Sequence, residues 1–228
     1  MLTDLEWSAI RLSMNVALRS VVLNLPLAMM VAWVLARRRF RGRALLDAFV
    51  HLPLVLPPVV VGYGLLLIFG SRGPIGSILA ERLGIHLAFT PSGAALATAV
   101  MTFPLMVRTI RLSLEAVDPG LEEAARTLGA GRIDRFFSIT LPLMAPGVLS
   151  GAILAFAAGL GEFGAVITFV SNIPGHTQTL PLAMYTALQS PGGEETAAKL
   201  AVVSFTLALI GLIASELVGR RVRARLGR

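Results

Sequence analysis

The 228-residue sequence contains no cysteine, a single lysine and few acidic residues. Without cysteine, a disulfide framework, a thiolate nucleophile and a cysteine-ligated metal site are all excluded. Charged residues make up 14% of the chain, whereas soluble domains average about 25%. Apolar residues reach 55%, and so few charges cannot cover that much apolar surface in a soluble fold. The composition therefore indicates an integral membrane protein.

Residues that could harvest energy or catalyse a reaction are also missing. Lys199, the single lysine, follows two alanines rather than a glycine-rich loop, so the sequence has no P-loop. The three histidines are far apart and form no metal-ligand pair at helical spacing. No serine, histidine and aspartate stand in the local motifs of a hydrolase. We therefore expect no catalytic residue, no metal and no cofactor in a chain that is not an enzyme.

The charge-free tracts indicate where the chain crosses the membrane, because about 20 apolar residues span the hydrocarbon core as a helix. We predict an all-α fold with five transmembrane helices, at about 13–36, 45–69, 88–110, 138–161 and 199–219. A further tract, 163–193, contains three prolines and several polar residues, which would leave unpaired backbone groups in lipid. We expect the segment 162–198 to lie at the outer face, where it can dip into the membrane without crossing.

The arginines predict the orientation of these helices. Three clusters, at 37–43, 108–135 and 220–228, hold 15 of the 20 basic residues. Short basic loops stay in the cytoplasm, so five crossings place the N-terminus outside and the C-terminus inside. A basic patch could instead bind nucleic acid, but each cluster adjoins an apolar tract, so we expect the lipid bilayer as partner and no nucleic acid. The chain, 1–228, is expected to form one transmembrane domain, with a core over about 9–219 and a cytoplasmic basic tail.

The second predicted span is interrupted by three prolines. Pro53, Pro57 and Pro58 each lack a backbone donor and disturb the preceding helical turn. Two interpretations remain open: a kink that serves packing, or a distorted helix that lines a path through the membrane.

The loop after the third span predicts a short capped helix over about 119–128. Asp118 suits the N-cap position and Pro119 suits the first helical turn. Gly129 is a natural terminator, expected at positive φ. Glu123 supplies negative charge near the helix start, which the helix dipole favours. Two adjacent alanines keep one surface of the helix shallow, so that a partner can approach closely; as bare chemistry, the loop could also be no more than a capped surface helix.

One pattern in this loop resembles a motif of a known family. Residues 123–142 read Glu-Ala-Ala, three residues, Gly, nine residues, Ile-x-Leu-Pro, which is similar to the coupling motif of importer permeases in the ATP-binding-cassette family. In that family the motif forms a helix that fits a cleft on a cytoplasmic ATPase subunit. The resemblance implies a type-1 permease core and the following ATPase-docking residues: Glu123, Ala124, Ala125, Arg126 and Gly129.

Further segments narrow the resemblance to the molybdate permeases of this family. These segments are 52–63, 125–131, 161–164, 168–175 and 183–185. The resemblance implies an ATP-driven importer of molybdate, or also tungstate, in the bacterial inner membrane. It also implies a homodimer, a dimer of cytoplasmic ATPase subunits and a periplasmic molybdate-binding protein as partners.

Three alternatives remain. A permease for sulfate or another oxyanion shares the same architecture. A secondary carrier or channel would keep charged groups near the membrane midplane, and the sequence lacks them there. A membrane scaffold without transport would make the coupling motif an accident.

The substrate path is expected to be neutral, with hydroxyl and backbone N–H groups that guide an oxyanion without trapping it. Candidate residues are Pro57, Pro58, Thr168, Ser171 and Asn172, of which the last three could equally serve only a surface loop. Glu162 would repel an anion in the path, so we expect its carboxylate to bond to neighbouring backbone instead.

Overall fold

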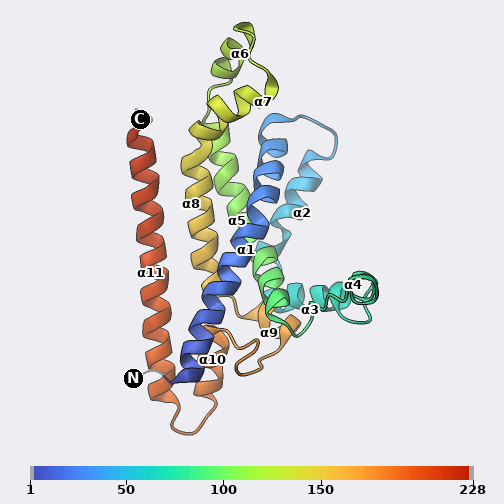
Figure 1. The fold of residues 1–228 in the computed structure, drawn as a ribbon, viewed down its shortest axis with the longest axis vertical. Helices are drawn as coiled ribbons and strands as arrows, with labels where there is room; N and C mark the ends of the chain where they lie inside the picture. Colours follow the sequence, from blue (N-terminus) through green and yellow to red (C-terminus); the bar gives the residue numbers. More distant parts are fainter. Residues whose placement is uncertain (1–2, 226–228) are drawn as a thin grey trace.

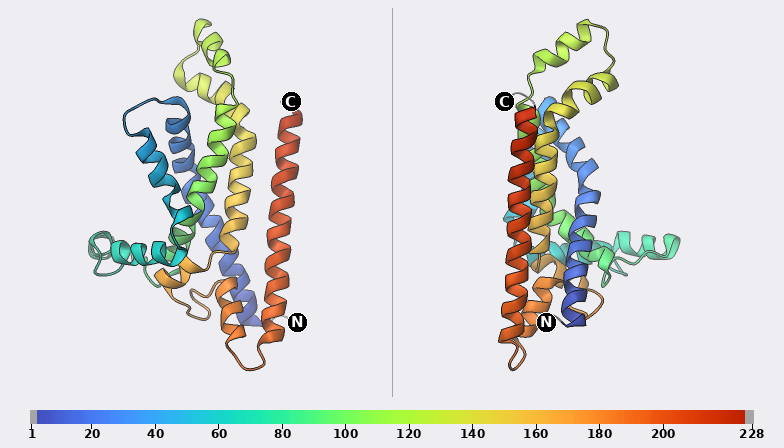
Figure 2. Two further views of the ribbon diagram at one scale, coloured as in Figure 1. Left: turned by 180° about the vertical axis from the view of Figure 1, so that it is seen from behind. Right: turned by 60° about the vertical axis from the view of Figure 1, so that its left-hand side comes forward.

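The computed structural model describes residues 3–225, and within that range every regular element is a helix. In chain order the elements are α1 (Asp4–Arg37), α2 (Arg43–Val55), α3 (Pro58–Phe69), α4 (Pro74–Leu83), α5 (Pro91–Glu115), α6 (Pro119–Thr127), α7 (Arg132–Arg135), the π-helical turn η1 (Phe136–Thr140), α8 (Leu141–Leu160), α9 (Gly164–Val170), α10 (Leu180–Leu188) and α11 (Glu194–Arg225). The longest helices run along the long axis of the molecule, whereas α3 and α4 project to one side (Figures 1 and 2).

The predicted membrane spans are all present in the fold. Four helices are long and apolar enough to cross a membrane, namely α1, α5, α11 and the continuous helix Arg132–Leu160, which joins α7, η1 and α8. The pair α2–α3 makes a fifth candidate, although its two helices are bent by 113°. The two ends of the chain lie near opposite ends of the bundle (Figure 1), as an odd number of crossings requires.

Two helices extend well beyond the predicted span limits. Helix α1 begins at Asp4 rather than near residue 13, because Thr3 and Glu6 form a capping box that starts the helix early. Helix α11 continues to Arg225 and takes in most of the predicted tail, 220–228, whose last three residues lie outside the described range. The start of α1 is therefore set by a cap rather than by the limit of an apolar tract.

The sharp bend between α2 and α3 has a local cause in two consecutive prolines. Leu56 has φ −74° and ψ 143°, and Pro57 has φ −55° and ψ 133°, so both are extended. Each of the two precedes a proline, and a residue before proline is disfavoured in the α-helical region. Pro53, by contrast, lies inside α2 without ending it. The predicted distortion of the second span is confirmed, and it is a complete break.

Helix α5 lies at the centre of the bundle, between α1 and α8. The amide of Asn24 in α1 donates to the carbonyl oxygen of Ala99 (2.8 Å) and to the hydroxyl of Thr102 (3.2 Å) in α5, and such polar bonds join helices inside a membrane. A Cβ on Gly147 of α8 would lie 2.2 Å from the Cβ of Ser113. Only glycine therefore permits the observed approach of α8 to α5.

The segment 162–198 folds back at the end of the bundle opposite α6 (Figure 1). Its two short helices, α9 and α10, are joined by a loop and form no long span. Phe169, Val170 and Leu182 are buried in one core cluster with Val16 of α1. The segment is therefore an integral part of the outer end of the bundle, in agreement with the prediction that it does not cross the membrane.

Candidate functional site

Helices α6 and α7 form an arm that projects from the cytoplasmic end of the bundle (Figures 1 and 2); we call residues 118–135 the α6–α7 arm. The Asp118 carboxylate accepts a hydrogen bond from the Gly120 N–H (2.8 Å), and Pro119 occupies the first helical turn. Gly129 has φ +88°, and its N–H donates to the Arg126 carbonyl oxygen (3.1 Å). The predicted N-cap, Asp118, and the predicted terminator, Gly129, are therefore both present, and they define the two ends of α6.

The predicted docking residues lie together on this arm and face outward. Glu123, Ala124, Arg126 and Gly129 are exposed, and Ala125 is half-buried. Nothing lies within 4 Å of the position that a Cβ on Gly129 would take. Most of this face is therefore exposed, and a partner can reach it.

Two apolar side chains beside this face were not predicted. Leu128 is 88% exposed and Ile133 is 77% exposed; Leu128 lies outside the long apolar helices, and Ile133 lies in the first turn of the helix Arg132–Leu160. Exposed apolar residues on an arm in water mark a surface for binding another protein. The signal was present in the sequence as apolar residues beside the helix terminator, but position alone did not distinguish exposure from burial.

Glu122, also not predicted, fastens the arm to the bundle. Its Oε1 atom lies 3.3 Å from Nη2 of Arg37 at the end of α1 and accepts a hydrogen bond of 2.9 Å from the hydroxyl of Thr140. Its backbone carbonyl accepts a hydrogen bond of 3.4 Å from Arg135. The acidic residue of the first turn of α6 is Glu122, so the assignment of that role to Glu123 was wrong. Glu123 is exposed and is available to a partner.

The second half of the arm is continuous with a membrane span. Helix α7 passes through the π-helical turn Phe136–Thr140 directly into α8, and the whole stretch Arg132–Leu160 counts as one helix. Single π turns interrupt helices most often at functional sites. The second half of the arm and the fourth span are therefore parts of one continuous helix.

The proline bend and the outer segment meet at the contact between α3 and α9. A Cβ on Gly62 would lie 2.6 Å from the carbonyl oxygen of Ala165 and 2.8 Å from the Cβ of Thr168, and a Cβ on Gly164 would lie 2.7 Å from the Cβ of Pro58. The structure thus brings the candidate path residues Pro58 and Thr168 to one junction. Pro57 lies exposed at the bend itself.

Two of the three polar path candidates have side chains occupied by bonds within the chain, and the third side chain is exposed. The Thr168 hydroxyl donates to the carbonyl oxygen of Gly164 (2.8 Å). Asn172 donates to Thr186 (2.8 Å) and accepts from Gln178 (3.0 Å). Ser171 ends α9 at φ +64° and exposes its side chain. The polarity of Asn172 thus serves the loop between α9 and α10.

Glu162 bonds to backbone, as expected. Its Oε1 atom accepts a hydrogen bond of 2.9 Å from the N–H of Ala165 at the start of α9. Burial raises the pKa of the Glu162 carboxyl, and the hydrogen bond from Ala165 offsets part of that rise. The side chain is therefore part of the helix start and is directed into the fold.

An ionic cluster joins α2 to α5 near their cytoplasmic ends. Nη1 of Arg111 lies 3.1 Å from Oδ1 of Asp47, and its Nε lies 2.8 Å from Oε1 of Glu115. Nδ1 of His51 lies 3.3 Å from the same Asp47 oxygen. No group of three or more potential ligands in residues 3–225 could hold a metal ion. The cluster holds the inner half of the bent pair against the central helix.

A bundle of long apolar helices with a capped, exposed arm at its basic end is the architecture of a membrane protein that offers a surface to a partner. A family model described as "Binding-protein-dependent transport system inner membrane component" matches residues 24–224, and the chain belongs to this family. Permeases of this family work with an ATPase subunit and a periplasmic binding protein.

Curated relatives and a solved structure agree with this assignment. The chain is 59% identical over 227 residues to the "Molybdenum transport system permease protein ModB" of Escherichia coli (strain K12), covering 100% of the chain and 99% of the relative. It is 40% identical over 217 residues to the "Sulfate transport system permease protein CysW" of Synechocystis sp., covering 94% and 77% respectively. A crystal structure of a bacterial alginate ABC transporter contains a chain with the same fold, with a TM-score of 0.76 at 16% identity over 96% of this chain and 80% of that one.

Proposed function

We propose that this chain is the membrane-spanning subunit of an ATP-driven importer that carries molybdate, and also tungstate, across the inner membrane. The observation that carries this proposal is the 59% identity over the full length to a molybdenum transport permease. Import of a dianion against an inside-negative potential costs roughly 5 kcal/mol per 100 mV, at about 2.3 kcal/mol per charge. Because the sequence offers no nucleotide site, the chain itself is non-catalytic and the energy comes from the ATPase partner.

The α6–α7 arm is the part of the chain to which the ATPase docks. Its proposed docking residues are Glu123, Ala124, Ala125, Arg126 and Gly129, with Leu128 beside them. The exposure of this face and the positive φ of Gly129 support the assignment. Glu122 is a positioning residue, since it reaches α1 through Arg37 and fixes where the arm stands. Closure of the ATPase moves the arm, and the continuous helix Arg132–Leu160 conveys that movement into the membrane.

The functional unit is a homodimer whose path lies between two copies. Five spans are few for enclosing a path, and ten provide one around a central axis. The break at Leu56–Pro57 and the glycine contacts at Gly62 and Gly164 support a path wall at the junction of α3 and α9. Since Thr168 and Asn172 bond within the chain, backbone groups at this junction guide the anion.

Uptake into liposomes tests the substrate and the energy source together. Vesicles that contain the permease and its ATPase, with ATP inside and a molybdate-binding protein outside, are expected to accumulate molybdate and tungstate. A non-hydrolysable ATP analogue should abolish uptake; accumulation without ATP would favour a secondary carrier. The 40% identity to a sulfate permease favours sulfate as the second candidate, and efficient sulfate uptake without molybdate uptake would assign the chain to it.

A further inference from the structure

A cavity of about 800 Å³ lies between the last three turns of α1 and the start of the fourth span, outside the proposed docking face and the proposed path. Its apolar lining consists of Pro26, Met29, Met30, Trp33, Ile133, Phe136, Phe137 and Met144. Met30 and Phe137 are exposed, so the cavity opens to the surroundings of the helices. An opening of this kind within a membrane span faces lipid or another protein.

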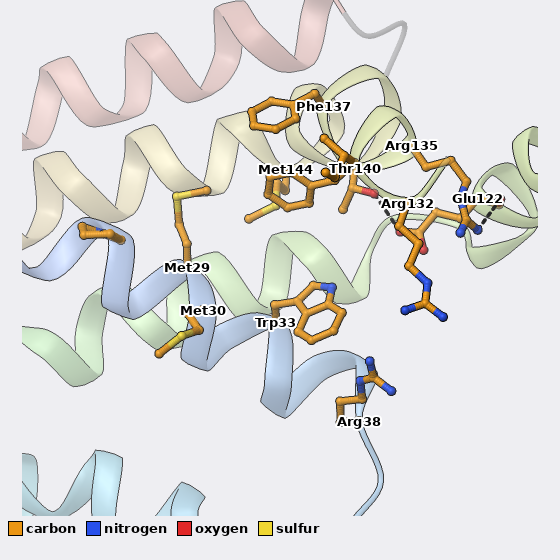
Figure 3. A pocket seen from close by; sticks show the side chains of 13 residues that line it. Met29, Met30, Trp33, Arg38, Glu122, Arg132, Arg135, Phe137, Thr140 and Met144 are labelled. Atoms are coloured by element: carbon orange, nitrogen blue, oxygen red, sulfur yellow. Dashed lines mark hydrogen bonds between the residues drawn. The ribbon is translucent and has the colours of Figure 1, made fainter. Parts of the chain in front are cut away.

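Positive charge lines one end of this cavity. Arg38, Arg132 and Arg135 contribute to its wall, and Figure 3 shows them at one end, with the methionines and Phe137 at the other. The guanidinium of Arg38 lies over the ring of Trp33, 4.9 Å from its centroid. Neither Arg38 nor Arg132 forms an ion pair with a carboxylate of residues 3–225. Glu122, which also lines the cavity, is engaged by Arg37 and Thr140.

The cavity has the length of one lipid leaflet. Pro26 and Arg38 are twelve residues apart on α1, or about 18 Å at 1.5 Å per residue. Half the hydrocarbon core of a bilayer is about 15 Å thick. Trp33 lies between the apolar part and the arginines, which is the position that tryptophan prefers at a membrane interface. The arginines therefore stand at headgroup level when the methionines stand at acyl-chain level.

We propose that one anionic phospholipid of the cytoplasmic leaflet occupies this cavity. Arg38 and Arg132 hold its phosphate, and an acyl chain lies against Met29, Met30 and Phe136. A free oxyanion would leave the apolar lining uncovered. A second copy of this chain would bring its own arginine clusters to the same end, where like charges repel. The lipid contacts both α1 and α7, so it joins the base of the α6–α7 arm to the first span.

The two tryptophans of the chain provide the test. Full-length protein with Trp7→Phe keeps Trp33 in the cavity, and Trp33→Phe keeps Trp7 near the outer end of α1 as the matched control. Each is reconstituted in phosphatidylcholine vesicles that contain a small, equal fraction of either dibrominated phosphatidylglycerol or dibrominated phosphatidylcholine. Bromine on the acyl chain quenches a neighbouring indole, so each tryptophan reports the lipids next to it.

We expect Trp33 to be quenched at a several-fold lower fraction of brominated phosphatidylglycerol than of brominated phosphatidylcholine, and Trp7 to show no preference. Each arginine near a membrane surface contributes about a fivefold gain in binding of an anionic lipid. Loss of both contributions, in Arg38→Gln with Arg132→Gln, should therefore abolish the several-fold preference. The pair Arg39→Gln with Arg41→Gln removes the same charge from exposed neighbours outside the cavity and should preserve it.

Four results would overturn the proposal. Equal quenching of Trp33 by both lipids would mean ordinary lipid contact, and no quenching by either would mean that a protein covers the cavity. If both arginine pairs lose the preference equally, the preference comes from general surface charge and not from this cavity. A preference abolished by inorganic phosphate, but not by chloride at the same ionic strength, would indicate a site for a free oxyanion.

Discussion

The two ends of the molecule are held together in different ways. At the cytoplasmic end, the α6–α7 arm is fastened by one carboxylate, Glu122, and leaves the side chains of Leu128 and Ile133 exposed. At the outer end, α3 and α9 pack through glycine contacts, and Asn172 is bonded to Thr186 and Gln178 within the chain. Exposed apolar side chains thus stand on the arm where we propose that the ATPase binds, whereas the polar group of Asn172 near the proposed path stabilises the fold.

The largest effect is expected from changes on the docking face of the arm. Ala125→Trp adds bulk at the proposed contact with the ATPase, and overpacking a tight contact costs about 1–3 kcal/mol. Gly129→Val places a β-branched residue at φ +88°, with a strain of about 1 kcal/mol or more. Both variants should insert in the membrane while ATPase capture weakens and uptake is abolished.

A second variant at position 129 separates backbone strain from added volume. Asparagine tolerates positive φ far better than valine does, and the two side chains are similar in size. Gly129→Asn should therefore retain most ATPase capture, measured on the same purified membranes. If Gly129→Asn and Gly129→Val lose capture equally, the left-handed conformation of Gly129 is not what the docking face requires.

The next effect concerns the close packing of the outer end. Gly62→Ala would place a Cβ 2.6 Å from the carbonyl oxygen of Ala165, whereas a Cβ on Gly64, two residues further along α3, meets nothing within 4 Å. We expect Gly62→Ala to destabilise the protein by about 1–3 kcal/mol and to lower the Tm by several degrees in detergent. Gly64→Ala should leave the Tm unchanged or slightly higher. Equal Tm values for the two variants would contradict the contact between α3 and α9.

A smaller effect is expected from weakening the ion pair between Glu122 and Arg37, which holds the arm against α1. Glu122→Gln weakens the pair with Arg37, which is half-buried, and the expected cost is about 1 kcal/mol. The loop 128–131 should become more accessible to protease, and uptake should fall several-fold. Glu123→Gln is the matched control, since the exposed carboxylate of Glu123 does not fasten the arm, and its proteolysis should match that of the parent. If the two variants are equally sensitive to protease, Glu122 does not position the arm.

The smallest effect is expected at Asn172. Asn172→Ala removes hydrogen bonds to Thr186 and Gln178, so the Tm should fall by a few degrees, at about 1 kcal/mol per lost bond. The KM for molybdate should change less than twofold, since this amide serves the loop. A large rise in KM without a change in Tm would indicate that Asn172 contacts the substrate.

The features that could be predicted from the sequence are those with local causes. Apolar tracts marked the spans, Asp118 and Gly129 marked the ends of α6, and the paired prolines marked the break in the second span. The pair of Arg37 with Glu122 joins residues 85 positions apart, and nothing local distinguishes Glu122 from Glu123. Likewise, Asn172 in a polar loop has the same local sequence whether its amide faces a substrate or Thr186. Tertiary packing determines which of these side chains forms the contact, and the local sequence does not encode it.

The central claim is that the ATPase docks on the α6–α7 arm, and the absence of cysteine makes a direct measurement possible. Ala124→Cys on the arm and Ile78→Cys on α4, both at exposed positions, each provide a single attachment site for a photoactivatable maleimide. In transport-active membranes, we predict that illumination joins the ATPase to the chain labelled at 124 and not to the chain labelled at 78. A transport-active complex with no adduct from position 124, or with equal adducts from both positions, would contradict the account.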